Sequence, residues 1–434
     1  MFARRIAVIG SGYVGLTTGA CLASLGHRVV CADIDAAKIE RLRRGEVDIV
    51  EPGLVELVVE NQAAGRLEFV VGAREAIARP EHQPVEVVFL CVPTPMGEGG
   101  AADLAAIRAV AAEVRHLLPA GCVVVNKSTV PVGTAEATLK LLNRRDVAVV
   151  SNPEFLREGS AVHDFLHPDR IVVGCDAQDA AERVAALYSK LGAPAVLTDA
   201  ASAEMVKYAA NCFLAMKLSY VNALAELCDL LGADVGDVTE GMGYDRRIGQ
   251  AFLRPGPGWG GSCLPKDTNA LVQVAAAAGR ELPLVSASIA TNERQRALMV
   301  DKIRDAVGGD LAGRRLGLLG LTFKAGTDDL RDSPALAVAQ LLRVEGAELT
   351  AYDPGCSAAV PGMTDAVTVV DDPMVAAKAA EALVVLTEWP VFRSLDWAAL
   401  AGVLGQRIVV DTRNLLDPDV LRRAGISWIG VGRR

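Results

Sequence analysis

The sequence of 434 residues is poor in aromatic side chains, which make up 4% of it, and it contains five histidines. It also lacks a basic excess, since 44 lysines and arginines stand against 53 aspartates and glutamates. General nucleic-acid binding needs clustered lysine and arginine to neutralise phosphates, so we do not expect it here. The core must be built from alanine, valine and leucine, and an anionic ligand must be held by local features.

Long apolar runs and paired cysteines are missing as well. No stretch of 18 uncharged apolar residues occurs, and the apolar run near the N-terminus stops at Gly10, too early for a secretory signal. The nine cysteines are odd in number and form no CxxC pair, and His163 and His167 lack the glutamate of an HExxH motif. We expect a cytoplasmic protein with reduced thiols, no membrane span and no metal, and we interpret both histidines as loop residues.

The first segment has the features of a dinucleotide-binding unit. A short apolar strand is predicted before the Gly-Ser-Gly-Tyr-Val-Gly run that begins at Gly10, and a helical pattern and a second strand ending at Asp33 follow. Gly10 permits a tight turn, Gly12 lets the backbone approach a pyrophosphate, and Gly15 allows close helix–strand packing. Asp33 has the spacing to bind a ribose diol and repels a 2′-phosphate, which favours NAD over NADP. We interpret the neighbouring Asp35 as a helix cap.

Three further apolar strands are predicted in this half, and each ends in an unusual polar segment. The strands are 85–91, 122–126 and 147–150, and the polar segments that follow them are 92–95, 127–134 and 151–159. Because helical patterns lie between the strands, the sheet is predicted to be parallel. Ligands bind beyond the carboxyl ends of such strands, where these three segments would meet.

The middle of the chain is predicted to contain one long helix. Residues 199–231 include neither glycine nor proline, and such a helix would be about 50 Å long, enough to bridge two domains and contact a partner chain. Lys207 and Asn211 are four residues apart and share a face of it. Further on, Cys263 follows a glycine- and proline-rich approach and stands just ahead of another predicted helix, with Pro265 at its first position and Lys266 nearby. Both the helix N-terminus and the lysine favour the thiolate, so we predict a nucleophile.

The last segment is predicted to be a second doubly wound unit without a GxGxxG motif. Its predicted strands are 315–321, 348–351, 383–387 and 408–411, with a helix at 333–345. Lys324, Arg331 and Arg413 follow strand ends, where cations would answer the charge of a bound phosphate. The fold class is therefore α/β, with two doubly wound Rossmann-like domains joined by a long central helix in an all-α middle segment.

Seven motifs together resemble the UDP-glucose/GDP-mannose dehydrogenase family of nucleotide-sugar dehydrogenases, over nearly the whole chain. They are GSGYVG at 10–15, VPTP at 92–95, STVPVGT at 128–134, NPEFLREG at 152–159, the Lys207–Asn211 pair, GGSCLPKD at 260–267 and FKAGTDDLRDSP at 323–334. The resemblance implies an NAD-binding domain at 1–198, a central helical dimerisation domain at 199–306 and a UDP-sugar-binding domain at 307–434.

The resemblance also implies a reaction, the oxidation of a sugar CH2OH to a carboxylate with two NAD+ and no release of the aldehyde. Cys263 matches the nucleophile that forms a thiohemiacetal and then a thioester. Lys207 and Asp267 match the groups that handle the alcohol proton and stabilise charge with an ordered water. Thr129, Asn211 and Glu154 match residues around that water, and Glu154 is the candidate base for thioester hydrolysis.

The motifs carry two sets of expected binding residues. The expected cofactor-binding residues are Gly10, Gly12, Tyr13, Val14, Gly15, Asp33, Lys38, Thr94, Thr129, Glu158, Lys266 and Arg331. The expected substrate-binding residues are Glu154, Phe155, Leu156, Arg157, Lys207, Asn211, Arg247, Phe252, Gly260, Phe323, Lys324 and Arg413. The resemblance assigns to Arg247 a reach into the neighbouring subunit's substrate, which implies a homodimer or a higher homo-oligomer.

The identity of the sugar depends on two features. The segment 241–249 is similar to the UDP-glucose branch, whereas Leu264 stands where many UDP-glucose enzymes have an aromatic residue and the GDP-mannose branch often has leucine. UDP-glucose is the expected substrate, and GDP-mannose or a UDP-N-acetylhexosamine is the alternative. Outside the family, a two-electron hydroxyacid dehydrogenase would need no Cys263, and a non-catalytic NAD and nucleotide sensor would need neither Cys263 nor Lys207.

Overall fold

The structure divides into two compact units, which are described separately. It is a computed structural model that describes residues 3–78 and 83–433. The first unit comprises Met1–Ala210 and Asn269–Gly279, and the second comprises Asn211–Thr268 and Arg280–Arg434. The bounds of the three domains inferred from the sequence stay a prediction.

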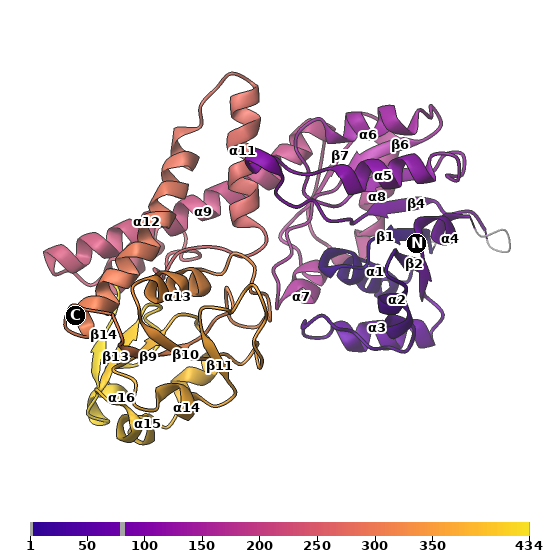
Figure 1. The fold of residues 1–434 in the computed structure, drawn as a ribbon. Helices are drawn as coiled ribbons and strands as arrows, with labels where there is room; N and C mark the ends of the chain where they lie inside the picture. Colours follow the sequence, from indigo (N-terminus) through magenta and orange to yellow (C-terminus); the bar gives the residue numbers. More distant parts are fainter. Residues whose placement is uncertain (1–2, 79–82, 434) are drawn as a thin grey trace. The chain divides into compact units, whose positions relative to one another are not determined.

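The first unit is built on an eight-stranded sheet of order β3-β2-β1-β4-β5-β6-β7-β8 (Figure 1). All neighbouring strands pair in parallel except β6 and β7, which pair in antiparallel fashion at Ser151 and Gly174. The predicted parallel sheet is thus confirmed for its first six strands. The strands are β1 Arg5–Ile9, β2 Arg28–Asp33, β3 Leu67–Val71, β4 Val87–Leu90, β5 Val123–Asn126, β6 Ala148–Ser151, β7 Ile171–Gly174 and β8 Ala195–Thr198.

Helices cover both faces of this sheet because its strands are apolar on both sides. In β1, Ile6 and Val8 belong to one buried cluster, and Ala7 and Ile9 belong to another. The first cluster includes residues of α1 Tyr13–Ser24, α2 Ala36–Arg43, α3 Leu54–Ala63, α7 Ala161–Leu166 and α8 Gln178–Leu187. The second includes residues of α4 Ala73–Ile77, α5 Ala105–Val114 and α6 Thr134–Leu142. The layered arrangement places the carboxyl ends of the strands at one edge, where a ligand binds in such folds.

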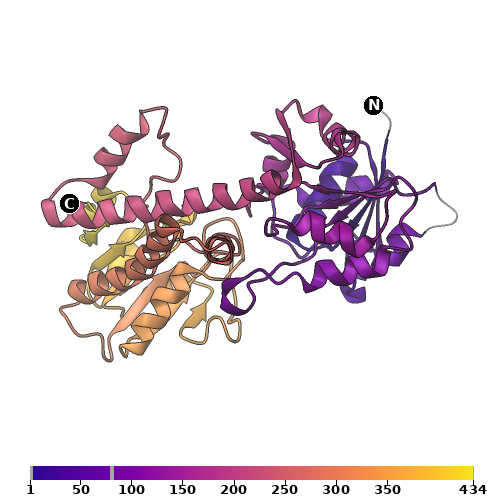
Figure 2. The same cartoon turned by 90° about the horizontal axis from the view of Figure 1, so that it is seen from above.

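The middle of the chain is all α-helical, as predicted, and the structure shows four helices there. They are α9 Ala200–Leu231, α10 Val235–Gly243, α11 Leu264–Ala277 and α12 Pro283–Ala306. The helix α9 has 32 residues, which confirms the long helix predicted over 199–231. Figure 2 shows it as one uninterrupted helix. Cys263 is the residue directly before α11, also as predicted, although Pro265 occupies the second helical position and not the first.

The second unit contains a six-stranded parallel sheet of order β11-β10-β9-β12-β13-β14. Its strands are β9 Arg315–Leu319, β10 Glu348–Tyr352, β11 Thr368–Val370, β12 Ala382–Val385, β13 Ile408–Asp411 and β14 Ser427–Ile429. One face packs on α12 and α13 Pro334–Val344, and the other packs on α14 Pro373–Ala377, α15 Trp397–Val403 and α16 Pro418–Arg423. The first strand ends two residues earlier than predicted because Gly320, at φ 101°, turns the chain out of extended geometry.

The two histidines that were interpreted as loop residues differ in their placement. His163 lies within α7 and not in a loop, because Val162 and Phe165 give this segment a buried helical face; His167 follows the helix. The two imidazole rings stack with centroids 4.7 Å apart.

Among residues 3–78 and 83–433, no group of three metal-binding side chains occurs and no helix combines the length and apolar character needed to cross a membrane.

Candidate active site

The glycine-rich turn between β1 and α1 has the shape that a bound pyrophosphate needs. A Cβ atom on Gly15 would lie 1.8 Å from the carbonyl oxygen of Gly10, so turn and helix pack closely only with glycine there. A Cβ atom on Gly12 would meet nothing within 4 Å, which leaves open space beside the start of α1. An anionic group is favoured at a helix N-terminus. The fingerprint residues therefore fit a dinucleotide.

Asp33 ends β2 beside this turn. Its carboxylate accepts hydrogen bonds from the N–H groups of Ser11 at 3.0 Å and Asp35 at 3.1 Å, and Lys38 Nζ lies 3.1 Å from Oδ2. Burial raises the pKa of Asp33, but the two N–H donors and Lys38 outweigh burial and hold the pKa below its ordinary value. The side chain of Asp35 accepts from the Lys38 N–H at the start of α2, which confirms the predicted cap.

The polar segments after β4 and β5 are tied to each other. Thr94 Oγ1 donates to the carbonyl oxygen of Thr129 at 2.9 Å, and Ser128 Oγ donates to the carbonyl oxygen of Val92 at 2.6 Å. Both segments thus lie at the carboxyl ends of adjacent strands, as predicted. Their mutual hydrogen bonds give this edge of the sheet a fixed shape.

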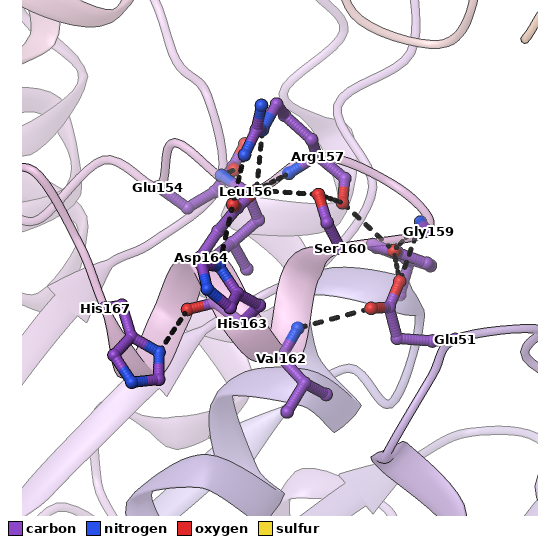
Figure 3. A network of polar contacts seen from close by, with 11 residues as sticks. Glu51, Glu154, Leu156, Arg157, Gly159, Ser160, Val162, His163, Asp164 and His167 are labelled. Carbon is purple, nitrogen blue, oxygen red and sulfur yellow. Dashed lines mark hydrogen bonds and ion pairs between the residues drawn. The ribbon is translucent and has the colours of Figure 1, made fainter. Parts of the chain in front are cut away.

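The segment after β6 is held by a network of polar contacts (Figure 3). The N–H of Leu156 donates to Glu154 at 2.6 Å, and Arg157 pairs with Asp164 of α7 at 2.6 Å. Glu51 accepts from the N–H groups of Gly159 at 2.8 Å and Val162 at 3.3 Å. The second half of the loop that carries Glu154 is therefore anchored to α7 and to Glu51.

Glu51 also joins this segment to the glycine-rich turn. The hydroxyl of Tyr13, in the first turn of α1, donates to the Glu51 carboxylate and accepts from the N–H of Gly159 at 2.9 Å. Glu51 was not predicted from the sequence, because its partners Tyr13 and Gly159 are 38 and 108 residues away along the chain. The turn at Pro52 and Gly53 that follows it was the available signal.

A buried ion pair forms between Glu154 and Lys207 of α9. The Lys207 Nζ lies 3.0 Å from Glu154 Oε1, and their side chains are 4% and 6% exposed. Burial raises the pKa of Glu154, but Lys207, the Leu156 N–H and the more distant Lys127 outweigh it and leave the pKa below its ordinary value. Glu154 is therefore a carboxylate at neutral pH, the form that a general base requires.

The ring of Phe155, next to Glu154 in the chain, stacks against the Arg170 guanidinium, whose central carbon lies 3.5 Å from the ring centroid.

In the second unit, Asp267 lies at the centre of a second polar group. Asn211 Nδ2 donates to Asp267 Oδ2 at 2.6 Å, and Lys266 Nζ lies 2.5 Å from Asp267 Oδ1. The Asp267 residue is fully buried, and Cys263 lies four residues before it at the N-terminus of α11. A helix N-terminus favours the thiolate form of a cysteine. The role of Cys263 as a nucleophile stays a prediction. Lys207 and Asn211, one turn apart on α9, contact Glu154 and Asp267 respectively.

The other predicted substrate residues of the second unit lie near the glycine-rich approach to Cys263 or at strand ends. A Cβ atom on Gly260 would lie 2.0 Å from the Asp332 carbonyl oxygen, so only glycine permits this approach. Phe252 adopts φ 62°, a strained conformation for an aromatic residue and one that marks functional loops. The Lys324 ammonium lies 5.5 Å from the centroid of the Phe323 ring, and Arg413 Nε donates to the Leu386 carbonyl oxygen at 2.9 Å.

Arg247 and Arg331 are placed differently from the other predicted residues. Their side chains are 89% and 57% exposed, and each pairs with a nearby aspartate, Asp245 at 2.6 Å and Asp329 at 2.7 Å. Within the second unit, neither is part of the polar group around Asp267. Their predicted roles in ligand binding stay predictions.

Comparison with known proteins identifies the family. Residues 4–192 match the NAD binding domain of the UDP-glucose/GDP-mannose dehydrogenase family, residues 201–294 match its central domain, and residues 317–418 match its UDP binding domain. The chain belongs to the UDP-glucose/GDP-mannose dehydrogenase family. The resemblance inferred from the seven motifs is thereby confirmed.

Individual UDP-glucose/GDP-mannose dehydrogenase family members match over almost their full length. The UDP-glucose 6-dehydrogenase of Rhizobium meliloti (strain 1021) is 44% identical over 99% of both chains. The UDP-glucose 6-dehydrogenase TuaD of Bacillus subtilis (strain 168) is 42% identical over 99% of this chain and 93% of its own. The solved structure of a UDP-glucose dehydrogenase from the archaeon Pyrobaculum islandicum is 38% identical, with a TM-score of 0.89 over 100% of this chain and 98% of that chain.

Proposed function

We propose that this member of the UDP-glucose/GDP-mannose dehydrogenase family oxidises UDP-glucose to UDP-glucuronate with two NAD+ and one water, through a thiohemiacetal and a thioester on Cys263. The observation that carries the proposal is the placement of Cys263 directly before α11, one turn ahead of a buried Asp267 that Asn211 and Lys266 hold. The named relatives at 44% and 42% identity support UDP-glucose as the substrate.

The first sheet provides the cofactor site. NAD+, when bound, supplies the acceptor for the hydride that leaves the sugar in each oxidation. The N-terminus of α1 and the open space beside Gly12 hold the pyrophosphate, and the Asp33 carboxylate binds the ribose diol. Lys38 keeps Asp33 charged and oriented.

Lys207, Asp267 and Cys263 act in the conversion of the alcohol to a covalent adduct. Lys207 and Asp267 handle the proton of the sugar hydroxyl and stabilise the charge on its oxygen. The Cys263 thiolate then attacks the aldehyde carbon, a carbon–sulfur bond forms, and the oxygen takes up a proton to give a thiohemiacetal. The covalent bond keeps the aldehyde from escaping or hydrating before the second oxidation.

Glu154 acts after the second oxidation has converted the thiohemiacetal to a thioester. As a carboxylate it takes a proton from the attacking water, with Thr129 and Asn211 positioning that water. The carbon–sulfur bond breaks, the sugar leaves as a carboxylate, and Cys263 regains its sulfhydryl form. One water and two NAD+ thus account for the four electrons and the added oxygen.

Phe323, Lys324 and Arg413 of the second unit hold the nucleotide of the substrate. The ammonium of Lys324 and the guanidinium of Arg413 offset the charge of the diphosphate. The match of residues 317–418 to the family's UDP binding domain supports this assignment.

A substrate panel tests the proposal. We expect kcat/KM for UDP-glucose to exceed those for GDP-mannose, UDP-N-acetylglucosamine and UDP-N-acetylmannosamine by at least tenfold. With UDP-glucose, NAD+ should be preferred over NADP+ by roughly 100-fold or more, because a 2′-phosphate beside the Asp33 carboxylate costs several kcal/mol. A higher kcat/KM for any other sugar nucleotide would overturn the substrate assignment, and equal use of the two cofactors would overturn the role of Asp33.

We further propose that the chain works as a homodimer or a multiple of one, with α9 in the interface. Three large side chains spaced by seven residues, Phe213, Tyr220 and Leu227, are 56%, 54% and 48% exposed. With Leu231, which is 72% exposed, they lie on one side of α9. Large apolar side chains gathered on one exposed helix face are typical of interfaces.

An aspartate in the middle of this face should disrupt the assembly. For Tyr220→Asp we expect the mass from light scattering to fall to that of one chain, because a carboxylate would be desolvated in the interface. Val344→Asp is the matched control, since Val344 on α13 is 79% exposed and lies outside the proposed face. An active wild-type monomer would contradict the proposed assembly.

A further inference from the structure

The polar edge of the first sheet contains a second buried cation, Lys127, to which the proposed function assigns no role. Lys127 comes directly after β5, next to Ser128 and Thr129, and the residue is 5% exposed. A buried ammonium is costly unless its surroundings compensate its charge.

The Lys127 ammonium is held in place by side chains that are themselves fixed. Its Nζ donates to Asn152 Oδ1 at 3.1 Å, and the hydroxyl of Tyr188 donates to the same oxygen at 2.6 Å. The amide of Asn152 cannot turn, because its Nδ2 donates to the Val172 carbonyl oxygen at 2.7 Å. The ammonium also lies 5.5 Å from the centroid of the Tyr188 ring. Asn152 and Tyr188 are 1% and 4% exposed.

Asn152 and Tyr188 are neutral, so they orient the Lys127 ammonium but do not balance its charge. The Glu154 carboxylate balances it. The titratable groups that act on Lys127 are the Glu154 carboxylate, the Lys207 ammonium and the Cys91 thiol, with the Tyr188 phenol beside them. Glu154 attracts Lys127, whereas Lys207 repels it. One buried carboxylate is thus shared between two buried ammonium groups, and Lys207 is the one in direct contact with it.

We propose that Lys127 is a positioning residue for the oxidation of UDP-glucose, which acts through Glu154 by holding that carboxylate in its anionic, base-competent form. This inference rests on the proposed function, because it requires Glu154 to act as the base that hydrolyses the thioester. Lys127 touches neither substrate nor cofactor in this assignment. Lys127 acts on the Glu154 carboxylate through its positive charge, which Asn152 holds at a fixed place.

The pH range in which the Lys127 charge acts on Glu154 follows from the titration of Lys127 itself. Burial lowers the pKa of Lys127, and although Glu154 and Cys91 oppose this, the pKa falls to about 8. Lys127 is therefore charged throughout the acidic range in which Glu154 takes up its proton. Without that charge, the pKa of Glu154 rises, and activity that needs the anionic form is lost at a higher pH as the solution is acidified. Well above the pKa of Glu154, the wild type and a neutral variant both carry the anionic carboxylate, so their activities should converge.

The test is the pH dependence of kcat for UDP-glucose oxidation in Lys127→Met and Lys127→Gln. We expect the acidic midpoint to move upward by about one pH unit, the size of shift that a nearby charge produces. The KM for UDP-glucose should stay within about threefold, and the kcat ratio to wild type should approach one on the alkaline side. Lys127→Arg keeps the charge and should restore the wild-type midpoint.

Tyr188→Phe is the matched control for a purely structural role. It removes the other hydrogen bond to Asn152 Oδ1 but leaves the Lys127 charge, so its acidic midpoint should equal that of the wild type. A folded neutral variant with an unmoved midpoint, or a shift in Tyr188→Phe as large as in Lys127→Met, would overturn the inference. Failure of both neutral variants to fold would also count against it, since Lys127 would then be needed for folding. A wild-type enzyme that does not oxidise UDP-glucose would instead overturn the proposed function.

Discussion

Cys263→Ala should abolish formation of the sugar carboxylate, with kcat reduced by at least about 10⁴-fold, as expected for loss of a catalytic nucleophile. Without the sulfur, an aldehyde-level product cannot be held as a thiohemiacetal, so the second oxidation has no covalent substrate. Binding of NAD+ and UDP-glucose, measured by calorimetry, should stay within a few-fold, because Cys263 is only partly buried and the substitution removes one sulfur atom.

Cys263→Ser should stall at an ester, which intact-mass spectrometry would detect, because a hydroxyl is a weaker nucleophile and its ester a poorer acyl donor. Cys175→Ala is the control, since Cys175 is also partly buried but follows β7, away from the predicted machinery. It should retain near wild-type activity. Carboxylate formation by Cys263→Ala at a near wild-type rate would contradict covalent catalysis at this residue.

Glu154→Gln should trap the thioester. Glutamine has nearly the same shape and can still accept the Leu156 N–H, but it cannot take a proton from water. Each active site should form two NADH rapidly and then turn over roughly 10²–10⁴ times more slowly than the wild type. Intact-mass spectrometry should show the acyl adduct, and alkylation of Cys263 should be blocked until the adduct decays.

Glu204→Gln is the matched control for loss of a buried carboxylate. Glu204 is 2% exposed and accepts from the N–H groups of Gly133 at 2.7 Å and Ala135 at 2.8 Å, where α6 begins. Its replacement should lower the melting temperature without an acyl adduct. A Glu154→Gln enzyme that turns over at the wild-type rate, or one that never produces the first NADH, would show that Glu154 is not the hydrolytic base.

The sequence predicted those features that depend on short spans of the chain. The glycine-rich turn, the Asp35 cap and the long helix α9 each follow from spacing within one or two elements, and each was predicted correctly. The antiparallel pairing of β6 with β7 was not predicted, because strand direction depends on where the chain returns and not on local pattern. His163 was assigned to a loop because the buried spacing of α7 extends over only six residues.

In the candidate site, too, residues in short motifs were predicted and residues that depend on long-range contacts were missed. Cys263 and the Lys207–Asn211 pair were found from spacing and motif. The structure places Lys207 beside Glu154 and Asn211 beside Asp267. Lys127 was not selected, because a lysine after a strand is ordinarily solvated, and its burial results from the packing of β5, β6 and α8 around Asn152. Glu51 was missed for a similar reason, since its role depends on contacts with residues far away in sequence.

Four-electron oxidation through a covalent intermediate is tested by the ratio of NADH formed to UDP-glucose consumed by the wild-type enzyme, with the product identified by mass spectrometry. We expect two NADH per UDP-glucose, UDP-glucuronate as the product, and no aldehyde captured by a trapping amine in solution. A ratio of one with an aldehyde or ketone product would contradict it, because a single oxidation needs no nucleophile at Cys263 and no base at Glu154.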